Sequence, residues 1–224
     1  MSVDFLKRTF GLDGQVAVVF GGIEADSTAL AAGLAQAGAT IVVAGDDEAR
    51  GYRCVYLLRA LGSPSGFMPV DLSCKRSIAD LLDRVLGEHG RVDLLLGIVD
   101  LDASRNASPD IAPSTALVEA AAEVFGKSMR RQDERGSMVF VGFGDAEQES
   151  VGAFCAAVES AARQVGSTDV RVHGVIAGKS GDRNAIEVPA EPMGGSADDL
   201  VGAIVWLASR RASGGLATRL LHFG

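Results

Sequence analysis

Short apolar segments alternate with amphipathic segments along the chain, and this alternation restricts the possible folds more than any other feature. The apolar segments have the length of buried strands and lie at residues 15–20, 40–44, 66–70, 93–99, 137–141, 170–176 and 218–223. The segments with helical spacing lie at residues 27–37, 47–61, 75–88, 115–131, 149–165 and 198–209. Continuously apolar strands between helices are typical of a parallel sheet covered on both faces. The sequence therefore predicts an α/β fold with a doubly wound parallel sheet.

Length and charge predict one domain and exclude several partners. The chain has 224 residues, and neither a Pro/Ser/Gly-rich linker nor a block of charge divides it, so we expect a single domain over residues 1–224. Its net charge of −8 argues against a nucleic-acid or membrane partner. No apolar run is long enough to span a membrane, and residues 1–10 lack a signal-peptide core.

The cysteines and histidines are scattered. Cys54, Cys74 and Cys155 are odd in number and have no metal-ligand spacing, and the three histidines lie far apart in sequence. We therefore expect no metal site and a reduced, cytoplasmic setting.

The turn after the first predicted strand combines glycines with acidic residues. Gly21 and Gly22 end the apolar run, and Glu24 and Asp26 follow them. A nucleotide-binding turn uses glycines for close approach to the pyrophosphate and leaves the positive end of the helix dipole free for it. At about 4 Å and an effective dielectric near 20, each like charge would cost a phosphate roughly 4 kcal/mol. The turn therefore looks like a dinucleotide site with its anion pocket closed; alternatively, Asp26 or Ser27 simply caps the following helix.

Six segments form a recognisable series: DGQVAVVFGG at 13–22, PVDL at 69–72, GRVDLLL at 90–96, RGSMVFV at 135–141, VRVHGVIAG at 170–178 and VWLAS at 205–209. In this order they resemble the short-chain dehydrogenase/reductase family over essentially the whole chain. The resemblance implies a Rossmann-type sheet of about seven strands. It also implies a dimer or tetramer built from the helices before and after the fifth strand.

The nucleotide-binding pattern of that family is incomplete in this chain. The family's Thr-Gly-x-x-x-Gly-x-Gly falls on Phe20, Gly21, Ala25 and Ser27, so one glycine of three remains. The side chains of Ala25 and Ser27, which stand where the family has glycine, narrow the space through which a phosphate would approach the amino-terminal end of the helix. We therefore expect neither NAD nor NADP as a cofactor.

Other positions that the family uses for cofactors carry only weak candidates. Asp46 and Asp47 could bind a ribose hydroxyl and Asp71 lies where the family contacts adenine, but acidic residues after strands are also ordinary turn and cap residues. The family's Asn-Asn-Ala-Gly falls on residues 97–100, which read Gly-Ile-Val-Asp. Ser104, Asn106, Ser108 and Asp110 follow in a loop that could bind a polar ligand or be simply solvated.

The catalytic positions of the family carry no proton-transferring groups. The Tyr-x-x-x-Lys motif falls on Phe154 and Val158, and the Ser position on Gly142 or Phe143. The segment between the fourth and fifth strands is short, and the family's catalytic Asn has no counterpart in it. We therefore predict no catalytic, cofactor-binding or metal-binding residues.

Two further residues have functional and structural interpretations. Cys155 could be a nucleophile, but with no His or basic residue before Arg163 on its helix it fits a small buried apolar group better. Lys179 could meet an acidic ligand, and a solvated loop lysine is the simpler interpretation.

Three functions remain open at this point. The first is a catalytically inactive subunit in a hetero-oligomer, expected to be a tetramer, with an active short-chain dehydrogenase paralogue. In that complex the partner would carry out NAD-dependent oxidation of a hydroxyacyl-CoA or a similar secondary alcohol. The chain resembles the non-catalytic subunit of heteromeric short-chain alcohol dehydrogenases, such as that of benzylsuccinyl-CoA β-oxidation. The alternatives are a ligand-binding sensor that uses the residual cleft and an oxidoreductase with a non-standard active site.

The expected interface lies on the helix after the fifth strand. Small residues there permit close helix approach, as the family's interface requires: Ala153, Ala156, Ala157, Ser160 and Ala161.

Overall fold

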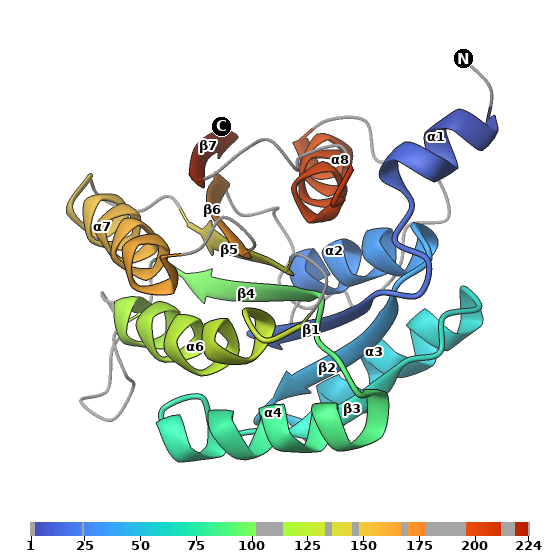
Figure 1. Ribbon diagram of the computed structural model, residues 1–224, viewed down its shortest axis with the longest axis horizontal. Helices are drawn as coiled ribbons and strands as arrows, with labels where there is room; N and C mark the ends of the chain where they lie inside the picture. Colours follow the sequence, from blue (N-terminus) through green and yellow to red (C-terminus); the bar gives the residue numbers. More distant parts are fainter. Residues whose placement is uncertain are drawn as a thin grey trace.

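A seven-stranded sheet forms the centre of the protein (Figure 1). The structure is a computed structural model that describes residues 3–23, 25–101, 114–132, 136–144, 148–166, 170–177, 196–211 and 218–223. All strand pairs are parallel and follow the order β3-β2-β1-β4-β5-β6-β7. The strands are β1 (Val16–Gly21), β2 (Thr40–Gly45), β3 (Gly66–Pro69), β4 (Leu94–Asp100), β5 (Gly136–Phe143), β6 (Val170–Ala177) and β7 (Thr218–Phe223). The predicted doubly wound sheet is confirmed, since each strand begins and ends within two residues of its predicted range.

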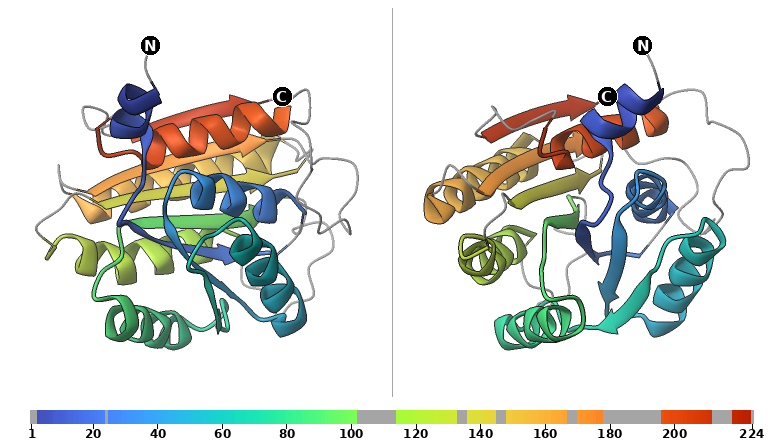
Figure 2. Two further views of the ribbon diagram at one scale, coloured as in Figure 1. Left: turned by 90° about the vertical axis from the view of Figure 1, so that its right-hand side faces the viewer. Right: turned by 45° about the vertical axis from the view of Figure 1, so that its right-hand side comes forward.

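Helices cover both faces of the sheet (Figures 1 and 2). They are α1 (Val3–Phe10), α2 (Ala25–Gln36), α3 (Glu48–Ala60), α4 (Lys75–His89), α6 (Ser114–Met129), α7 (Gln148–Val165) and α8 (Ser196–Ala208). One apolar cluster joins the sheet to α4, α6 and α7, and a second joins its other face to α2, α3 and α8. Because neighbouring residues of a strand point to opposite faces, Val18 and Phe20 belong to the first cluster and Val19 to the second.

Among the described elements, the helix α1 is the one that the sequence pattern did not predict. It has eight residues, which is too few for a helical period to be distinguished from chance. It lies beside the end of α8 (Figure 2), where the Ser209 hydroxyl donates to the Thr9 carbonyl oxygen at 2.6 Å. The Arg211 guanidinium donates to the Arg8 carbonyl oxygen at 3.0 Å. These hydrogen bonds fasten α1 to the body of the protein.

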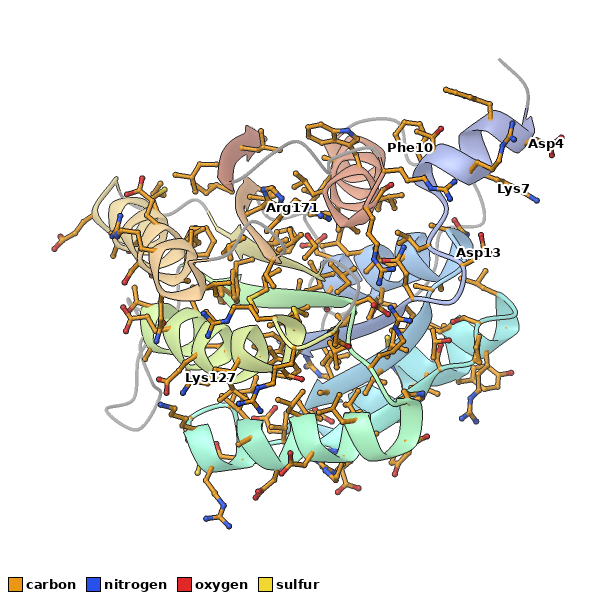
Figure 3. The ribbon with its side chains drawn as sticks, in the orientation of Figure 1. Asp4, Lys7, Phe10, Asp13, Lys127 and Arg171 are labelled. Atoms are coloured by element: carbon orange, nitrogen blue, oxygen red, sulfur yellow. The ribbon has the colours of Figure 1, made fainter. Side chains whose placement is uncertain are left out.

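Charged groups are buried near the amino-terminal edge of the sheet, away from the ligand-binding edge. The Asp93 carboxylate is 1% exposed and accepts hydrogen bonds from the Val16 amide at 2.8 Å, from Arg91 and from Arg210. This carboxylate therefore ties β1, β4 and the end of α8 together. Arg171 is also buried, on β6 (Figure 3).

Candidate functional site

The carboxyl ends of β1, β2, β4 and β5 form the candidate site. The strand order changes direction between β1 and β4, and open α/β sheets bind ligands in the crevice at such a switch point. A small hollow of about 50 Å³ lies there, lined by Gly22, Asp26, Ser27, Ile98, Val99, Asp100 and Phe143. A wide, open hollow of about 640 Å³ lies toward β2 and α3, lined by Gly22, Ile23, Asp46, Asp47, Glu48 and Arg50.

Contacts within the protein account for the first glycine of the β1–α2 turn. Gly21 has a φ of 120°, and a Cβ atom there would lie 2.2 Å from the carbonyl oxygen of Ile98 on β4. Gly21 therefore allows β1 and β4 to approach each other, a need that exists with or without a ligand. Gly22 has open space around its missing side chain. The next residue, Ile23, is 8% exposed and packs over Gly45 at the end of β2.

The start of α2 differs from the sequence-based prediction. The predicted caps, Asp26 and Ser27, both lie inside the first turn, because the helix begins at Ala25. The prediction was wrong because side-chain chemistry favours Asp or Ser as a cap but does not fix where the chain enters the helix. Ser27 is 5% exposed, so its hydroxymethyl group occupies space inside the turn where the family has glycine. Glu24 lies outside the described residues.

The open hollow is lined mainly by acidic side chains. Among the described residues of its lining, Asp46, Asp47 and Glu48 are acidic and Arg50 is the single basic residue. Asp47 caps α3 by accepting a hydrogen bond from the Arg50 amide at 3.0 Å, and its carboxylate lies 3.3 Å from the guanidinium of the same arginine. The guanidinium of Arg50 is thus already paired. A pyrophosphate placed here would meet an excess of negative charge.

Asp71, the predicted adenine contact, is engaged in its own turn. Its carboxylate accepts hydrogen bonds from the Ser73 amide at 2.9 Å and from the Ser73 hydroxyl at 2.6 Å. These bonds to Ser73 hold the pKa of the carboxyl below its usual value. Asp71 therefore organises the turn between β3 and α4.

Apolar side chains fill the ends of β4 and β5. The Leu101 amide donates to the Phe143 carbonyl oxygen at 2.8 Å, and both side chains are at least 95% buried. A Cβ atom at Gly142 would lie 2.9 Å from Leu101, so a serine there would fit only if Leu101 moved. The sequence analysis missed Leu101; an apolar residue directly after Asp100 was the signal that could have identified it.

The residues at the Tyr and Lys positions of the family motif belong to the apolar core. Phe154 is 1% exposed and Val158 is 0% exposed, and both pack in the cluster beneath α7. Val158 also contacts β6, because a Cβ atom at Gly174 would lie 3.3 Å from its methyl groups. The helix face that carries a reactive pair in the family is here a packed core face.

The five small residues of α7 that the sequence analysis assigned to an interface differ in their burial. Ala153 and Ala156 are exposed, and Ser160 is half-buried. Ala157 and Ala161 are 4% and 0% exposed and pack in the core. The interface prediction is therefore wrong for Ala157 and Ala161, because they lie at the margin of this helix face that packs on the sheet together with Phe154 and Val158.

Cys54 and Cys155 give no sign of a reactive thiol. Burial raises the pKa of Cys54 to about 11 and raises that of Cys155, so both favour the protonated form. Within the described ranges no three His, Cys, Asp or Glu side chains gather as metal ligands, and no helix is long and apolar enough to cross a membrane. Lys179 and the polar loop residues Ser104, Asn106, Ser108 and Asp110 lie outside these ranges.

A nicotinamide dinucleotide does not fit the residues that the structure describes at this edge. Ser27 narrows the turn where the phosphates would approach, the adjoining hollow is acidic, and Leu101 and Phe143 close the inner end of the crevice. The hollow at the switch point, about 50 Å³, is far below the several hundred Å³ that ligand pockets usually provide, and the adjoining hollow of about 640 Å³ is large enough but carries the acidic lining. We therefore derive no catalytic step through this cofactor.

Comparisons with known proteins identify the family. The short chain dehydrogenase family pattern matches residues 15–184, so the chain belongs to this family. No curated protein matches the sequence. Among solved structures, hydroxysteroid dehydrogenase from Escherichia coli has 19% identity and a TM-score of 0.78, with 100% of this chain and 98% of that chain covered. A 2-keto-3-deoxy-D-gluconate dehydrogenase from Streptococcus agalactiae has 22% identity and a TM-score of 0.75, with coverage of 99% and 96%. At such identities the likeness shows a shared fold.

Proposed function

We propose that this short-chain dehydrogenase is a catalytically inactive subunit that pairs with an active member of its family. The observation that carries the proposal is the burial of Phe154 and Val158 in the core, at the positions that bear the acid/base pair in the family. Acid/base chemistry needs a titratable group that reaches the substrate, and neither side chain titrates or reaches the surface. The partner would oxidise a hydroxyacyl-CoA or a similar secondary alcohol with NAD, within a hetero-oligomer that we expect to be a tetramer.

The misfit of a nicotinamide dinucleotide with the described residues supports the same proposal. The departures from the family pattern are independent of one another, because they lie in three separate places: the phosphate turn, the ends of β4 and β5, and the buried face of α7. A single repair would therefore not restore an active enzyme. By contrast, the sheet and its helix layers match two solved dehydrogenase structures over nearly their whole length.

The open hollow beside Asp46 favours a second candidate function. At about 640 Å³ it is large enough for a small molecule, and its acidic lining would select a neutral or cationic ligand. The chain would then act as a ligand sensor. Thermal stabilisation by one such compound, with no short-chain dehydrogenase bound, would favour this function over the first.

The proposed function is tested by purifying the tagged chain from its native cell. We expect an active short-chain dehydrogenase to co-purify and its turnover to fall when this chain is removed. Asp46→Asn and Asp100→Asn, both exposed in the candidate site, should leave the turnover of the complex unchanged, whereas loss of the partner's own catalytic tyrosine should abolish it. If either Asn variant lowers turnover while the complex stays intact, this chain takes part in the chemistry, as an oxidoreductase with a non-standard site would.

A further inference from the structure

The outer face of α3 carries two exposed tyrosines between an acid and a base. Tyr52 is 59% exposed and Tyr56 is 74% exposed, and they are two of the four large apolar side chains that are exposed among the described residues. Glu48 begins the helix, and Arg59 lies near its end; both are exposed. These four residues follow one another at intervals of four, four and three, so they lie on one line along the helix, which we call the α3 stripe.

We propose that the α3 stripe binds the same stripe of a second copy of the chain, with the two α3 helices antiparallel. A twofold axis midway between Tyr52 and Tyr56 places each Tyr52 opposite Tyr56 of the other copy. The midpoint of Glu48 and Arg59 differs from that position by only half a residue, so the same axis places Glu48 opposite Arg59 of the second copy. One register therefore pairs both the aromatic rings and the opposite charges, whereas a parallel arrangement would place like charges together.

The aromatic part of the stripe is held in place before a partner binds. The ring of Tyr52 meets the ring of Phe67 on β3 edge to face, with 5.2 Å between ring centroids and 62° between ring planes. Phe67 in turn packs over Gly51 of α3, where a Cβ atom would lie 2.2 Å from the phenyl ring. Because Tyr52 is already ordered, binding costs little of its side-chain entropy. Tyrosine and arginine are also the residue types enriched among those that contribute most to protein interfaces.

The charged ends of the stripe connect this contact with the candidate site. Arg59 donates through Nε to the Ser65 carbonyl oxygen at 2.8 Å, which positions the guanidinium and uses one of its five N–H donors. Glu48 lines the open hollow, whose described basic residue, Arg50, already pairs with Asp47. The second copy would therefore bring a further cation to the mouth of the hollow. Exposed ion pairs contribute little each, so these charges select the antiparallel register more than they supply affinity.

The size of the surface limits the strength of the contact. The 13-residue helix is about 20 Å long and cannot alone bury the roughly 800 Å² per partner of a standard interface. Leu61 and Pro64 are exposed just after the helix and extend the surface at its end. We expect a weak dimer with a dissociation constant on the order of 10 µM.

The inference goes beyond the proposed function and does not depend on it. The helix α3 belongs to the apolar cluster on one face of the sheet, and α6 and α7 belong to the cluster on the other face (Figure 1). A second copy bound at α3 would therefore leave α6 and α7 free for an active dehydrogenase.

A charge exchange measured by analytical ultracentrifugation tests the proposal. The purified chain should show a reversible association step across a micromolar concentration series. Glu48→Arg alone, or Arg59→Glu alone, replaces two opposite-charge pairs by two like-charge pairs and should raise the dissociation constant about tenfold. The double variant Glu48→Arg/Arg59→Glu restores both pairs and should return the constant to within about threefold of the original.

A neutral substitution tests the aromatic part of the stripe separately. Tyr56→Ser removes a ring that is 74% exposed, so the fold should stay intact while the dissociation constant rises about tenfold or more. Thermal unfolding of the variant checks the fold. A Tyr56→Ser chain that associates like the wild type would overturn the proposal.

Matched controls separate the stripe from general charge effects. Arg53 is exposed on the same helix but lies about 100° around it from Tyr52, so Arg53→Glu should change the dissociation constant by no more than about threefold. Arg76→Glu on α4, which breaks the exposed pair with Asp80, should have equally little effect. A wild-type chain without the association step, single exchanges without effect or a double variant that stays weak would each overturn the proposal.

Co-purification with Glu48→Arg distinguishes this proposal from the proposed function. An active dehydrogenase should co-purify with this variant as it does with the wild type. If it is lost only from Glu48→Arg, the active subunit binds at α3, which overturns a second copy as the occupant and leaves the proposed function intact.

Discussion

Replacing Val158 by lysine should destabilise the protein strongly, although it introduces the side chain that the family has at this position. Val158 is 0% exposed and its cluster is apolar. The change removes about 1.5–3 kcal/mol of burial. An ammonium without a partner adds several kcal/mol, or deprotonates with its pKa lowered by up to about 3–5 units. We expect the free energy of unfolding to fall by about 5 kcal/mol, which is comparable with the total stability of a small domain.

Urea unfolding at several pH values measures this effect and checks its cause. Because burial lowers the folded-state pKa of the new lysine below its unfolded value near 10.4, the folded state binds fewer protons than the unfolded state. The stability of Val158→Lys relative to the wild type should therefore rise as the pH increases toward about 10. Gln164→Lys, at an exposed position of the same helix, should change stability by no more than about 0.5 kcal/mol. If Val158→Lys unfolds at the wild-type urea concentration at every pH, this face of α7 is not buried and the case against a catalytic site loses its main support.

Three further outcomes are expected. Isothermal calorimetry of the isolated chain should show no binding of NAD(H) or NADP(H) at sub-millimolar concentration, and micromolar affinity would contradict the closed turn. The triple variant Phe143→Ser/Phe154→Tyr/Val158→Lys should catalyse no hydride transfer to NAD from any secondary alcohol, because the phosphate turn stays acidic; measurable turnover by the folded variant would refute a purely structural role. Burial raises the pKa of Cys54 to about 11, so the stabilisation by this thiol is complete below pH 9 and should decline as the pH rises from about 9 to 11. The variant Cys54→Ala should lack this decline in urea unfolding. If the variant and the wild type show the same pH profile, Cys54 is not the source of the decline.

The local pattern of the sequence was enough to predict the layers of the fold. Strand periodicity and helix spacing are properties of neighbouring residues, so the strand limits were predicted to within two residues. The absence of the family's Tyr and Lys was likewise visible at Phe154 and Val158 without any structure. The short α1 escaped the same approach because eight residues are too few to show a helical period, and the hydrogen bonds that hold it come from the distant Ser209 and Arg211.

What the tertiary structure decided is which side chains share a space, since that depends on strand register and helix rotation and not on local pattern. It placed the side chain of Leu101 next to Gly142. The position of the family's serine therefore lacks the hydroxyl, and the space that the serine side chain would need is occupied by Leu101. It assigned Ala157 to the core and its neighbour Ala156 to the surface. Both alanines read alike in the sequence, but a helix turns about 100° per residue, and only the packing of α7 on the sheet fixes which of them faces outward.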